Sequence, residues 1–421
     1  MNRTMKKVRN VDLRFSAPAS KSFTHRALIV GALATGTTTI KNALISIDTV
    51  LTARALELLG VPIHISENTV MITGCKGKFS PGHEVTLDLE NSGTSLRLLA
   101  SAALLSDMPV TLTGSSRMLE RPVKQLAEGI TAARGTVAYL GRNGFPPIRI
   151  DGRYFGGEIP VDGSVSSQFV SSLMIPAPYA EQETTIFLPN DPASKSYLDI
   201  TVQVMQDFGA NVWRKGYRTF RVGNRHKYVG REYTIEGDYS SASYFFAIAA
   251  ACGGTITVSG LNPASVQGDR VFTEALAMMG CWITYGETGV TVSRDGPLHG
   301  IAIDMSSSPD TVQTLAVVAA LADSPTKITG IGHLKFKESD RLTMTARLLE
   351  SLGGSVEVKE DSLMITPAPL HGGTINPEND HRTAMSFAVL GLATGDITVA
   401  DTECVNKSFP GFWKALEQAG L

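Results

Sequence analysis

The sequence predicts an α/β protein of two domains, each built from three copies of one repeated unit. Three observations support this prediction: a motif that recurs six times, a glycine that closes each copy, and an unpaired strand near the N-terminus. The motif is a short strand, a polar cluster, an apolar helix and a second strand rich in Thr, Val and Ile. A second helix follows in every copy and a β-hairpin in five, so the expected unit is βαβαββ.

The six copies follow one another along the 421 residues. They begin with VDLRFSAPASKSFTHRALIV, VTLDLENSGTSLRLLA, GEIPVDGSVSSQFVSSLM, YTIEGDYSSASYFFAIAA, IAIDMSSSPDTVQTLAVV and GTINPENDHRTAMSFAVL. We expect the second helix of each copy to end at a glycine, which is a common residue after a helix C-terminus. The closing glycines are Gly60, Gly135, Gly209, Gly280, Gly353 and Gly420.

The sixth copy lacks a final hairpin, whereas residues 8 to 15 read as a strand that no unit precedes. The economical interpretation is that this N-terminal strand completes the C-terminal half of the chain. One domain then comprises residues 18–236, and the other combines residues 1–17 with residues 237–421. Because ligands favour domain interfaces, we expect the active site in the cleft between the two domains.

Composition and charge exclude several classes of protein. A net charge of −2 argues against nucleic-acid binding, and no apolar run reaches the length of a membrane helix. The N-terminus lacks the apolar core of a signal peptide, and the four cysteines contain no CxxC pair. We therefore expect a cytoplasmic protein that binds neither nucleic acid nor membrane. We further expect it to act as a monomer and to need no metal or organic cofactor.

Basic residues stand at the start of several otherwise apolar helices, where the helix dipole disfavours a positive charge. Lys21, Arg26, Arg97 and Arg382 have this position. The neighbouring serines are most simply interpreted as N-caps, and a single basic residue as a solvated charge. Recurrence at the same point of different units favours anion binding instead. In such a pocket Asp310 of SSSPDTVQT would stay ionised and is a candidate general base.

Ten short motifs identify a family. They are SKSFTHRAL, NSGTSLR, RMLERP, DGSVSSQF, SKSYLDIT, EGDYSSASY, PDTVQTLA, KESDRL, NDHRTAMSF and NKSFPGF. With them the chain resembles the 5-enolpyruvylshikimate-3-phosphate synthase family over essentially its full length. The resemblance implies a two-domain inside-out α/β barrel of the enolpyruvyl transferase type. It also implies transfer of the enolpyruvyl group of phosphoenolpyruvate to the 5-hydroxyl of shikimate 3-phosphate, with release of phosphate.

The resemblance implies roles for matching residues. The expected ligands of shikimate 3-phosphate are Lys21, Ser22, Arg26, Ser166, Ser167, Gln168, Ser194, Tyr197, Asp310 and Lys337. The expected ligands of phosphoenolpyruvate are Lys21, Gly93, Arg117, Gln168, Arg341, Arg382 and Lys407. Asp310 is the expected base for the attacking hydroxyl. Glu338 and Lys21 are the alternatives for the proton on the methylene carbon.

The charges of the candidate residues agree with two anionic substrates. Two phosphates and two carboxylates carry a charge of roughly −5 to −6 together near neutral pH. The seven basic residues of the candidate set outnumber Asp310 and Glu338 by five. Gly93 leaves room beside the phosphate of phosphoenolpyruvate, which predicts inhibition by glyphosate, a compound that resembles that substrate.

One departure and two alternatives stay open. His333 stands where many members of the family have Asn. The first alternative is the related transferase that acts on UDP-N-acetylglucosamine, which usually carries a Cys in the loop GSSRMLERP and an Asn in place of Ser22. The second is a phosphometabolite-binding protein without catalysis, which would be expected to lack Asp310 and Glu338.

Overall fold

The computed structural model describes residues 1–287 and 289–421, which divide into two compact units. The continuous unit comprises Ala19–Ile235, and the split unit comprises Met1–Pro18 together with Glu236–Leu421. Each unit contains three repeats. Within the described residues five of the six repeats are βαβαββ and the sixth is βαβαβ, so the chain has the two-domain α/β fold that the repeats predict. None of the helices in the described residues is long and apolar enough to cross a membrane.

The continuous unit holds the first three repeats. The first consists of β14 (Glu232–Thr234), α1 (Lys21–Leu33), β3 (Thr37–Lys41), α2 (Ile47–Leu58), β4 (Ile63–Ser66) and β5 (Thr69–Thr73). The second consists of β6 (Val85–Asp88), α3 (Gly93–Ala102), η1 (Ala103–Leu105), β7 (Val110–Thr113), η2 (Met118–Glu120), α4 (Lys124–Ala132), β8 (Gly135–Tyr139) and β9 (Ile148–Gly152). The third consists of β10 (Gly157–Pro160), α5 (Ser167–Met174), η3 (Ala177–Tyr179), β11 (Thr184–Phe187), α6 (Ser196–Asp207), β12 (Val212–Lys215) and β13 (Thr219–Val222).

The split unit holds the other three repeats. The fourth consists of β2 (Val11–Ser16), α7 (Tyr239–Cys252), β15 (Gly254–Ser259), η4 (Gly268–Arg270), α8 (Val271–Met278), β16 (Trp282–Tyr285) and β17 (Gly289–Arg294). The fifth consists of β18 (Ala302–Asp304), η5 (Pro309–Thr311), α9 (Val312–Ala319), β19 (Thr326–Thr329), η6 (Gly332–Phe336), α10 (Arg341–Glu350), β20 (Ser355–Lys359) and β21 (Ser362–Thr366). The sixth consists of β22 (Gly373–Ile375), α11 (His381–Thr394), β23 (Ile397–Val399), η7 (Thr402–Lys407), α12 (Phe412–Gln418) and β1 (Arg3–Met5).

Each repeat forms one small sheet, and five of the six sheets in the described residues have four strands in the same order. In the second repeat the order is β6-β7-β9-β8, with β6 parallel to β7 and the hairpin strands antiparallel. The other four-stranded sheets repeat this order, and the sixth sheet has the order β1-β23-β22 in the described residues. In the second, third, fifth and sixth repeats the crossover from the first to the second strand carries a helix, which places the start of that helix beside the end of the first strand.

Two strands pair with a repeat other than the one that follows them in the sequence. β2 directly precedes α1 but lies parallel to β15, with Val11 opposite Gly254. β14 precedes α7 but lies parallel to β3, with Glu232 opposite Thr39. The assignment of VDLRFS to the first copy and YTI to the fourth is therefore wrong. Each strand ends in one unit while the helix after it begins in the other, so the two strands are exchanged.

The N-terminal segment completes two sheets rather than one. β1 pairs antiparallel with β23 of the sixth repeat, with Arg3 opposite Val399. The strand expected at residues 8 to 15 is β2, and it serves the fourth repeat.

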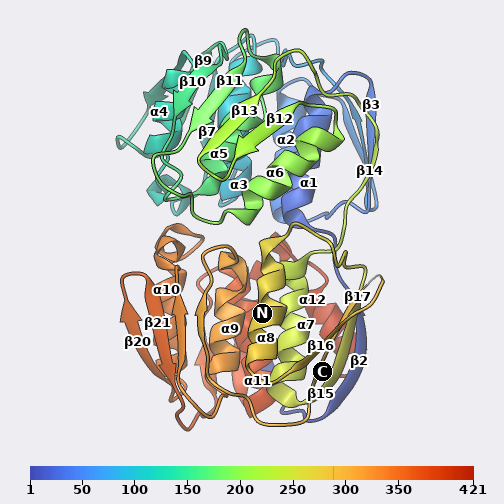
Figure 1. Ribbon diagram of the computed structural model, residues 1–421, viewed down its shortest axis with the longest axis vertical. Coiled ribbons are helices and arrows are strands. Elements are labelled where there is room, and N and C mark those ends of the chain that lie inside the picture. Colours follow the sequence, from blue (N-terminus) through green and yellow to red (C-terminus); the bar gives the residue numbers. More distant parts are fainter. Residues whose placement is uncertain (288) are drawn as a thin grey trace. The chain divides into compact units, whose positions relative to one another are not determined.

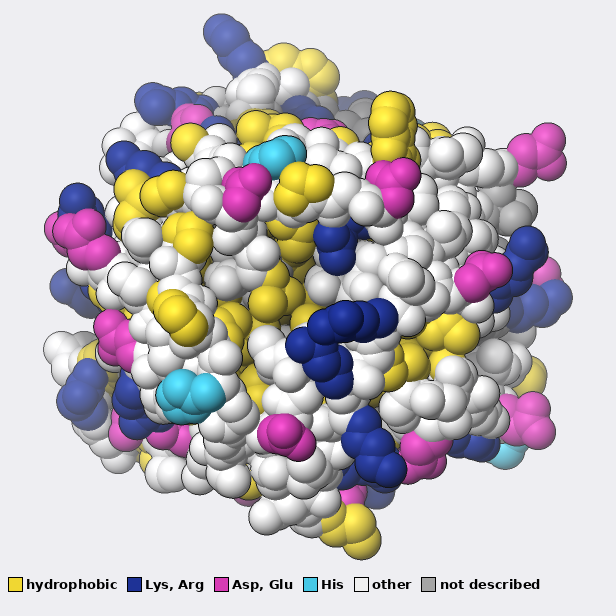
Figure 2. Space-filling model, turned by 90° about the horizontal axis from the view of Figure 1, so that it is seen from below, with side chains coloured by type: hydrophobic (Ala, Val, Ile, Leu, Met, Phe, Trp, Pro, Cys, Tyr) yellow, Lys and Arg dark blue, Asp and Glu magenta, His cyan; other side chains and the backbone are white. Residues whose placement is uncertain are grey.

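The first helix of each repeat lies in the core of its unit, and the sheets lie outside the helices (Figure 1). α9 is buried along its whole length, and α7 carries the apolar run YFFAIAAAC without a polar face. A helix that is apolar all round is stable only when other elements surround it. On the face of the molecule shown in Figure 2, acidic and basic side chains are interspersed, in keeping with the small net charge.

Glycine closes the second helix in five repeats. Gly60, Gly209, Gly280, Gly353 and Gly420 all have positive φ, between +78° and +102°. The expectation for Gly135 is wrong, because Arg134 adopts the left-handed conformation there with a φ of +68°. The guanidinium of Arg134 lies 3.8 Å from the centre of the Phe155 ring, a cation–π contact.

Candidate active site

Arg341 gathers three carboxylates in the split unit. Its side chain is only 1% exposed. Nη1 lies 3.0 Å from Asp310 Oδ1, Nη2 lies 2.8 Å from Glu338 Oε2, and Nε lies 2.8 Å from Asp380 Oδ2. One planar guanidinium thereby fixes the directions of three acids, a geometry that lysine does not offer.

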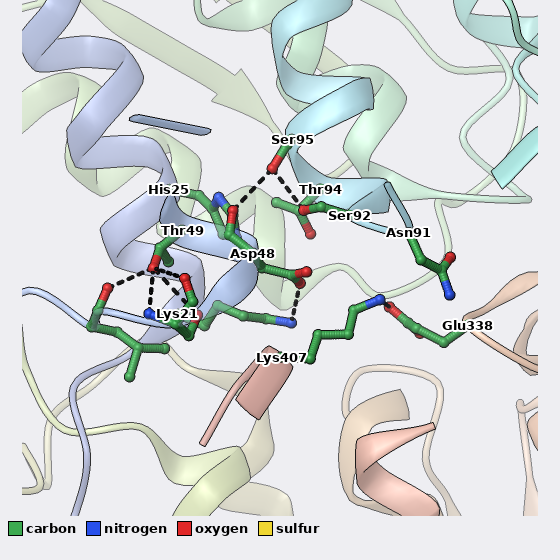
Figure 3. Close-up of polar contacts among 12 residues, drawn as sticks. Lys21, His25, Asp48, Thr49, Asn91, Ser92, Thr94, Ser95, Glu338 and Lys407 are labelled. Atoms are coloured by element: carbon green, nitrogen blue, oxygen red, sulfur yellow. Dashed lines mark hydrogen bonds and ion pairs between the residues drawn. The ribbon is translucent and has the colours of Figure 1, made fainter. Parts of the chain in front are cut away.

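A second arginine and a lysine complete this cluster. Arg382 Nη2 lies 2.6 Å from Asp310 Oδ2, so each oxygen of Asp310 faces a different arginine. Lys407 Nζ lies 3.7 Å from Glu338 Oε1 (Figure 3). The structure thus brings together five predicted residues. They are Asp310, Glu338, Arg341, Arg382 and Lys407.

Helix starts position this cluster. Arg341 and Arg382 lie in the first turns of α10 and α11. Asp380 is the N-cap of α11, and its carboxylate accepts hydrogen bonds from the Arg382 backbone N–H at 3.0 Å and from Ser339 Oγ at 2.9 Å. An acidic N-cap stabilises the helix start, and here the same carboxylate also orients Arg341.

Lys337 and His333 belong to the segment of η6. Lys337 follows the last residue of η6, and both side chains are partly buried. Burial, followed by the positive charge of Lys337, lowers the pKa of His333 from 6.5 to about 3. The His333 imidazole is therefore neutral near pH 7 and can donate or accept a hydrogen bond, as the Asn common at this position can.

The neutral state of His333 predicts a pH dependence of stability. Between pH 6.5 and about 3, the unfolded imidazole binds a proton that the folded one does not. The free energy of unfolding should therefore fall as the pH drops through this range, and His333→Gln should reduce that fall. Urea denaturation of both proteins at pH 7 and pH 4.5 measures the difference. An identical loss in the variant would show that His333 does not cause it.

Lys21 is the first residue of α1 in the continuous unit. Its Nζ lies 3.0 Å from Asp48 Oδ2, and Asp48 is 2% exposed in the first turn of α2 (Figure 3). Ser22 follows Lys21 and is partly exposed, and its carbonyl oxygen accepts a hydrogen bond from Arg26.

Arg26 is buried inside the continuous unit. Its Nε donates to Thr201 Oγ1 at 2.7 Å, and its terminal nitrogens donate to the carbonyl oxygens of Ser22 at 3.0 Å and Tyr197 at 3.2 Å. Burial lowers the pKa of Arg26 to about 10, which leaves the side chain charged at neutral pH. The guanidinium therefore ties the start of α1 to the start of α6.

The GSVSSQF motif forms the start of α5. Ser166 is the N-cap, and its Oγ accepts a hydrogen bond from the Gln168 N–H at 3.2 Å. Ser167 is the first helical residue and is buried. The Gln168 amide is fixed on both sides, because its Nε2 donates to Thr94 Oγ1 at 2.9 Å and its Oε1 accepts from Arg97 Nη1 at 2.9 Å.

Ser194 and Tyr197 flank the start of α6. Ser194 has a left-handed backbone, with a φ of +55°. A non-glycine residue in this conformation is uncommon, and such residues concentrate at ligand sites. The continuous unit therefore collects Ser22, Arg26, Ser194 and Tyr197 at the starts of two helices that Arg26 holds together.

Gly93 is the first residue of α3 and makes room for an arginine. A Cβ atom at Gly93 would lie 2.5 Å from Cζ of Arg121, whose side chain is 3% exposed. Arg121 Nη1 also lies 3.4 Å from the carbonyl oxygen of Asn91. Arg117, by contrast, has a 32% exposed side chain and pairs with Glu120 at 2.9 Å.

The structure provides protein partners for the basic residues at helix starts. Lys21 pairs with Asp48, Arg97 bonds to Gln168, and Arg382 pairs with Asp310. The argument that such a charge implies a missing anion is therefore weakened, because folding brings distant oxygen atoms to these positions.

Three residues of these clusters are absent from the set chosen from the sequence. They are Asp48, Arg121 and Asp380. Asp380 stands in the motif NDHRTAMSF, and Arg121 in RMLERP, so the motifs mark their neighbourhood. Arg121 differs from Arg117 in being buried, and burial depends on long-range packing that the sequence does not display.

The described part of the chain has no cluster of side chains suited to metal binding or to thiol catalysis. Residues 1–287 and 289–421 contain no group of three or more His, Cys, Asp or Glu side chains placed to hold a metal ion. The four cysteines are free thiols, and burial raises the pKa of Cys252 to about 12.

Two units of three α/β repeats, with acids and arginines at the helix starts, define the chain as an enolpyruvyl transferase. A family model described as EPSP synthase (3-phosphoshikimate 1-carboxyvinyltransferase) matches residues 5–416. The chain belongs to this family.

Individual relatives agree with this assignment. A 3-phosphoshikimate 1-carboxyvinyltransferase of Methanoculleus marisnigri is 60% identical over 411 residues, which cover 98% of this chain and 97% of the relative. One from Serratia proteamaculans is 40% identical over 417 residues, with coverage of 98% and 97%. The structure of an EPSP synthase from Acinetobacter baumannii superposes with a TM-score of 0.82 at 27% identity, covering 99% of this chain and 98% of that one.

Proposed function

We propose that the helix-start clusters of both units bind shikimate 3-phosphate and phosphoenolpyruvate, and that Asp310 is the general base. The reaction transfers the enolpyruvyl group of phosphoenolpyruvate to the 5-hydroxyl of shikimate 3-phosphate and releases phosphate. The observation that carries the assignment of the base is the position of Asp310 between Arg341 and Arg382. A carboxylate held in this way is ionised and fixed in direction, as a base must be.

Shikimate 3-phosphate is proposed to bind hydroxyl and basic groups at the starts of three helices in the continuous unit. Backbone N–H groups and the helix dipole favour a phosphate or a carboxylate at such a position. The proposed ligands in this unit are Lys21, Ser22, Arg26, Ser166, Ser167, Gln168, Ser194 and Tyr197. Lys337 and Asp310 of the split unit are proposed to bind the hydroxyl groups of the ring.

Phosphoenolpyruvate is proposed to bind Lys21, Gly93, Arg117, Gln168, Arg341, Arg382 and Lys407. We add Arg121 to this set, because its buried guanidinium fills the space that Gly93 leaves open. Buried arginines bind phosphate and carboxylate through parallel hydrogen bonds, which favours Arg121 over the more exposed Arg117.

The close approach of Arg121 to Gly93 predicts the effect of Gly93→Ala. The added methyl group must displace the guanidinium, so KM for phosphoenolpyruvate should rise by about tenfold or more, as expected for a lost charged hydrogen bond. Gly296→Ala is the matched control, since a Cβ there meets nothing within 4 Å. Steady-state kinetics measure both variants. An unchanged KM in Gly93→Ala would remove Arg121 from the proposed set.

The proposed mechanism is an addition followed by an elimination. An acid protonates the methylene carbon of phosphoenolpyruvate, and the 5-hydroxyl attacks the adjacent carbon while Asp310 takes its proton. The tetrahedral adduct then loses phosphate and a proton from its methyl group. Glu338 and Lys21 are the candidates for transfer of the proton on carbon. The contacts of Glu338 with Arg341 and Lys407 stabilise its ionised form, which suits the acceptor of the methyl proton.

Reaction in D₂O tests this mechanism. The methyl group of the adduct gains one deuteron and then loses one of its three hydrogen atoms, so the vinyl group of the product should contain deuterium. Proton NMR of the isolated product measures the incorporation. A product formed in D₂O without deuterium in its vinyl group would contradict the addition step.

Glyphosate provides a second test of the phosphoenolpyruvate site. We expect it to inhibit turnover in competition with phosphoenolpyruvate, because both carry a carboxylate and a phosphorus oxyanion. Rates that stay unchanged under excess glyphosate would contradict this prediction.

The chain is further proposed to act as a monomer in the cytoplasm, and light scattering in solution tests the oligomeric state.

A further inference from the structure

Asp269 is a buried carboxylate that the proposed mechanism does not use. It lies in η4 of the split unit and is 5% exposed. Ser240 Oγ donates to its Oδ2 at 2.5 Å, and Ser308 Oγ donates to its Oδ1 at 2.7 Å. Within residues 1–287 and 289–421, no basic side chain forms an ion pair with it. Burying a carboxylate costs free energy unless hydrogen bonds or opposite charges compensate it, so we asked what Asp269 contributes at this position.

Ser308 connects Asp269 to the turn that carries Asp310. Ser308 is fully buried and directly precedes η5. Its Oγ lies 2.8 Å from Thr311 Oγ1, and the Thr311 hydroxyl also lies 3.2 Å from the Ser308 carbonyl oxygen. These contacts join the residue before η5 to its last residue, with Asp310 between them. The hydrogen bond from Ser308 to Asp269 therefore anchors this turn to η4.

The continuous unit contains a similar arrangement with one difference. Asp48 is likewise buried at the start of the second helix of its repeat, but Lys21 Nζ lies 3.0 Å from its Oδ2. In the split unit the hydroxyl of Ser240 bonds to Asp269 instead. The charge of Asp48 is neutralised locally, whereas the charge of Asp269 acts on its surroundings.

Asp310 is the acid that this charge affects. Burial, followed by the negative charge of Asp310, raises the pKa of Asp269 to about 6, while the hydrogen bonds from Ser240 and Ser308 and the charge of Arg382 oppose the rise. The repulsion between the two carboxylates is mutual, so ionised Asp269 makes Asp310 hold a proton more strongly. Arg341 and Arg382 act in the opposite direction.

The charged and titratable groups around the two acids come from four further elements. They are Arg341 of α10, Arg382 of α11, His333 of η6 and Tyr244 of α7. His333 and Tyr244 are neutral near pH 7, because burial lowers the pKa of His333 to about 3 and raises that of Tyr244 to about 12. Glu338 and Asp380 also pair with Arg341, Lys407 lies beside Glu338, and Lys337 acts on His333. Asp269 is thus a further negative group near Asp310, and its charge opposes that of Arg382.

We propose that Asp269 is a positioning residue for the general base. It holds the turn of Asp310 through Ser308, and its negative charge preserves the basicity of a carboxylate that two arginines would otherwise weaken. This inference rests on the proposed role of Asp310.

Asp269→Asn tests the proposal, because the amide oxygen can still accept from Ser308 while the charge is lost. With a pKa of about 6, Asp269 takes a proton before Asp310 does as the pH falls, and the loss of its charge weakens the base, so kcat/KM of the parent enzyme should begin to fall there. Asp269→Asn lacks this step, so its acid limb should lie at lower pH and its kcat at neutral pH should already be reduced. The substrate phosphates titrate identically for both enzymes, so the difference reports on the protein. Asp323→Asn, at an exposed carboxylate of the same unit, should leave the profile unchanged.

Ser240→Ala provides a second test of the effect of the Asp269 charge on the general base. It removes one of the two hydrogen bonds that favour ionised Asp269, so the pKa of Asp269 should rise and the acid limb should begin at higher pH than in the parent enzyme. An acid limb that stays in place in both variants, while Asp310→Asn loses turnover, would overturn the inference and leave the proposed function intact. Near-normal turnover in Asp310→Asn would instead contradict the proposed base itself.

Discussion

Replacing Asp310 by Asn is expected to lower kcat by about 10²–10⁴-fold, the usual contribution of a general base. Both oxygens of Asp310 face arginines, so its carboxylate is ionised and directed without help from substrate. An amide at this position keeps the size of the side chain but cannot accept the proton of the attacking hydroxyl. The loss should therefore appear in kcat rather than in the affinity for substrates.

Steady-state kinetics and calorimetric binding of shikimate 3-phosphate separate these effects. We expect binding to change by a smaller factor than turnover, and circular dichroism to show an unchanged fold. Asp323→Asn, which removes an exposed carboxylate of the split unit, should retain full activity. Turnover of Asp310→Asn within a few-fold of the parent enzyme would exclude Asp310 as the base.

Arg341→Met is expected to destabilise the split unit by about 3–5 kcal/mol, the typical cost of removing one partner from a buried ion pair. Arg341 contacts Asp310, Glu338 and Asp380, whose side chains are between 0% and 17% exposed. Without the guanidinium, three carboxylates would stay in a poorly solvated region with fewer compensating charges. Their mutual repulsion adds to the loss of solvation.

Arg347→Met provides the matched control for this prediction. Arg347 lies on the same helix, α10, but pairs with Glu378 at the surface, where such pairs contribute at most about 1 kcal/mol. Hydrogen exchange of core amides in the split unit, measured for both variants, reports the change in its free energy of unfolding. Equal stability of the two variants would show that the cluster around Arg341 does not hold the unit together.

The repeats made the fold predictable, but not the pairing of every strand. Periodic apolar helices and Thr/Val/Ile strands are local signals, so six repeats follow from the sequence and agree with the structure, in which the sixth sheet has three strands rather than four in the described residues. The exchange of β2 and β14 depends on pairing between residues more than 190 positions apart, such as Glu232 with Thr39. Proximity in the sequence favoured the neighbouring repeat and gave the wrong sheet.

The candidate site shows the same division between local and long-range information. Motifs around helix starts indicated Asp310, Glu338, Arg341 and Arg382, and the structure places these four in one network. Asp380 is not among the residues chosen from the sequence, and only the fold shows that it pairs with Arg341. The roles of such polar side chains depend on partners from other repeats, and only the three-dimensional structure shows which partners these are.

Release of phosphate from phosphoenolpyruvate tests the central claim most directly. The reaction should be measured with shikimate 3-phosphate and, separately, with UDP-N-acetylglucosamine as the acceptor. We expect phosphate release that depends on shikimate 3-phosphate and is lost in Asp310→Asn, with no release above background for the nucleotide sugar. Release that requires UDP-N-acetylglucosamine, or that occurs with neither acceptor, would contradict the account.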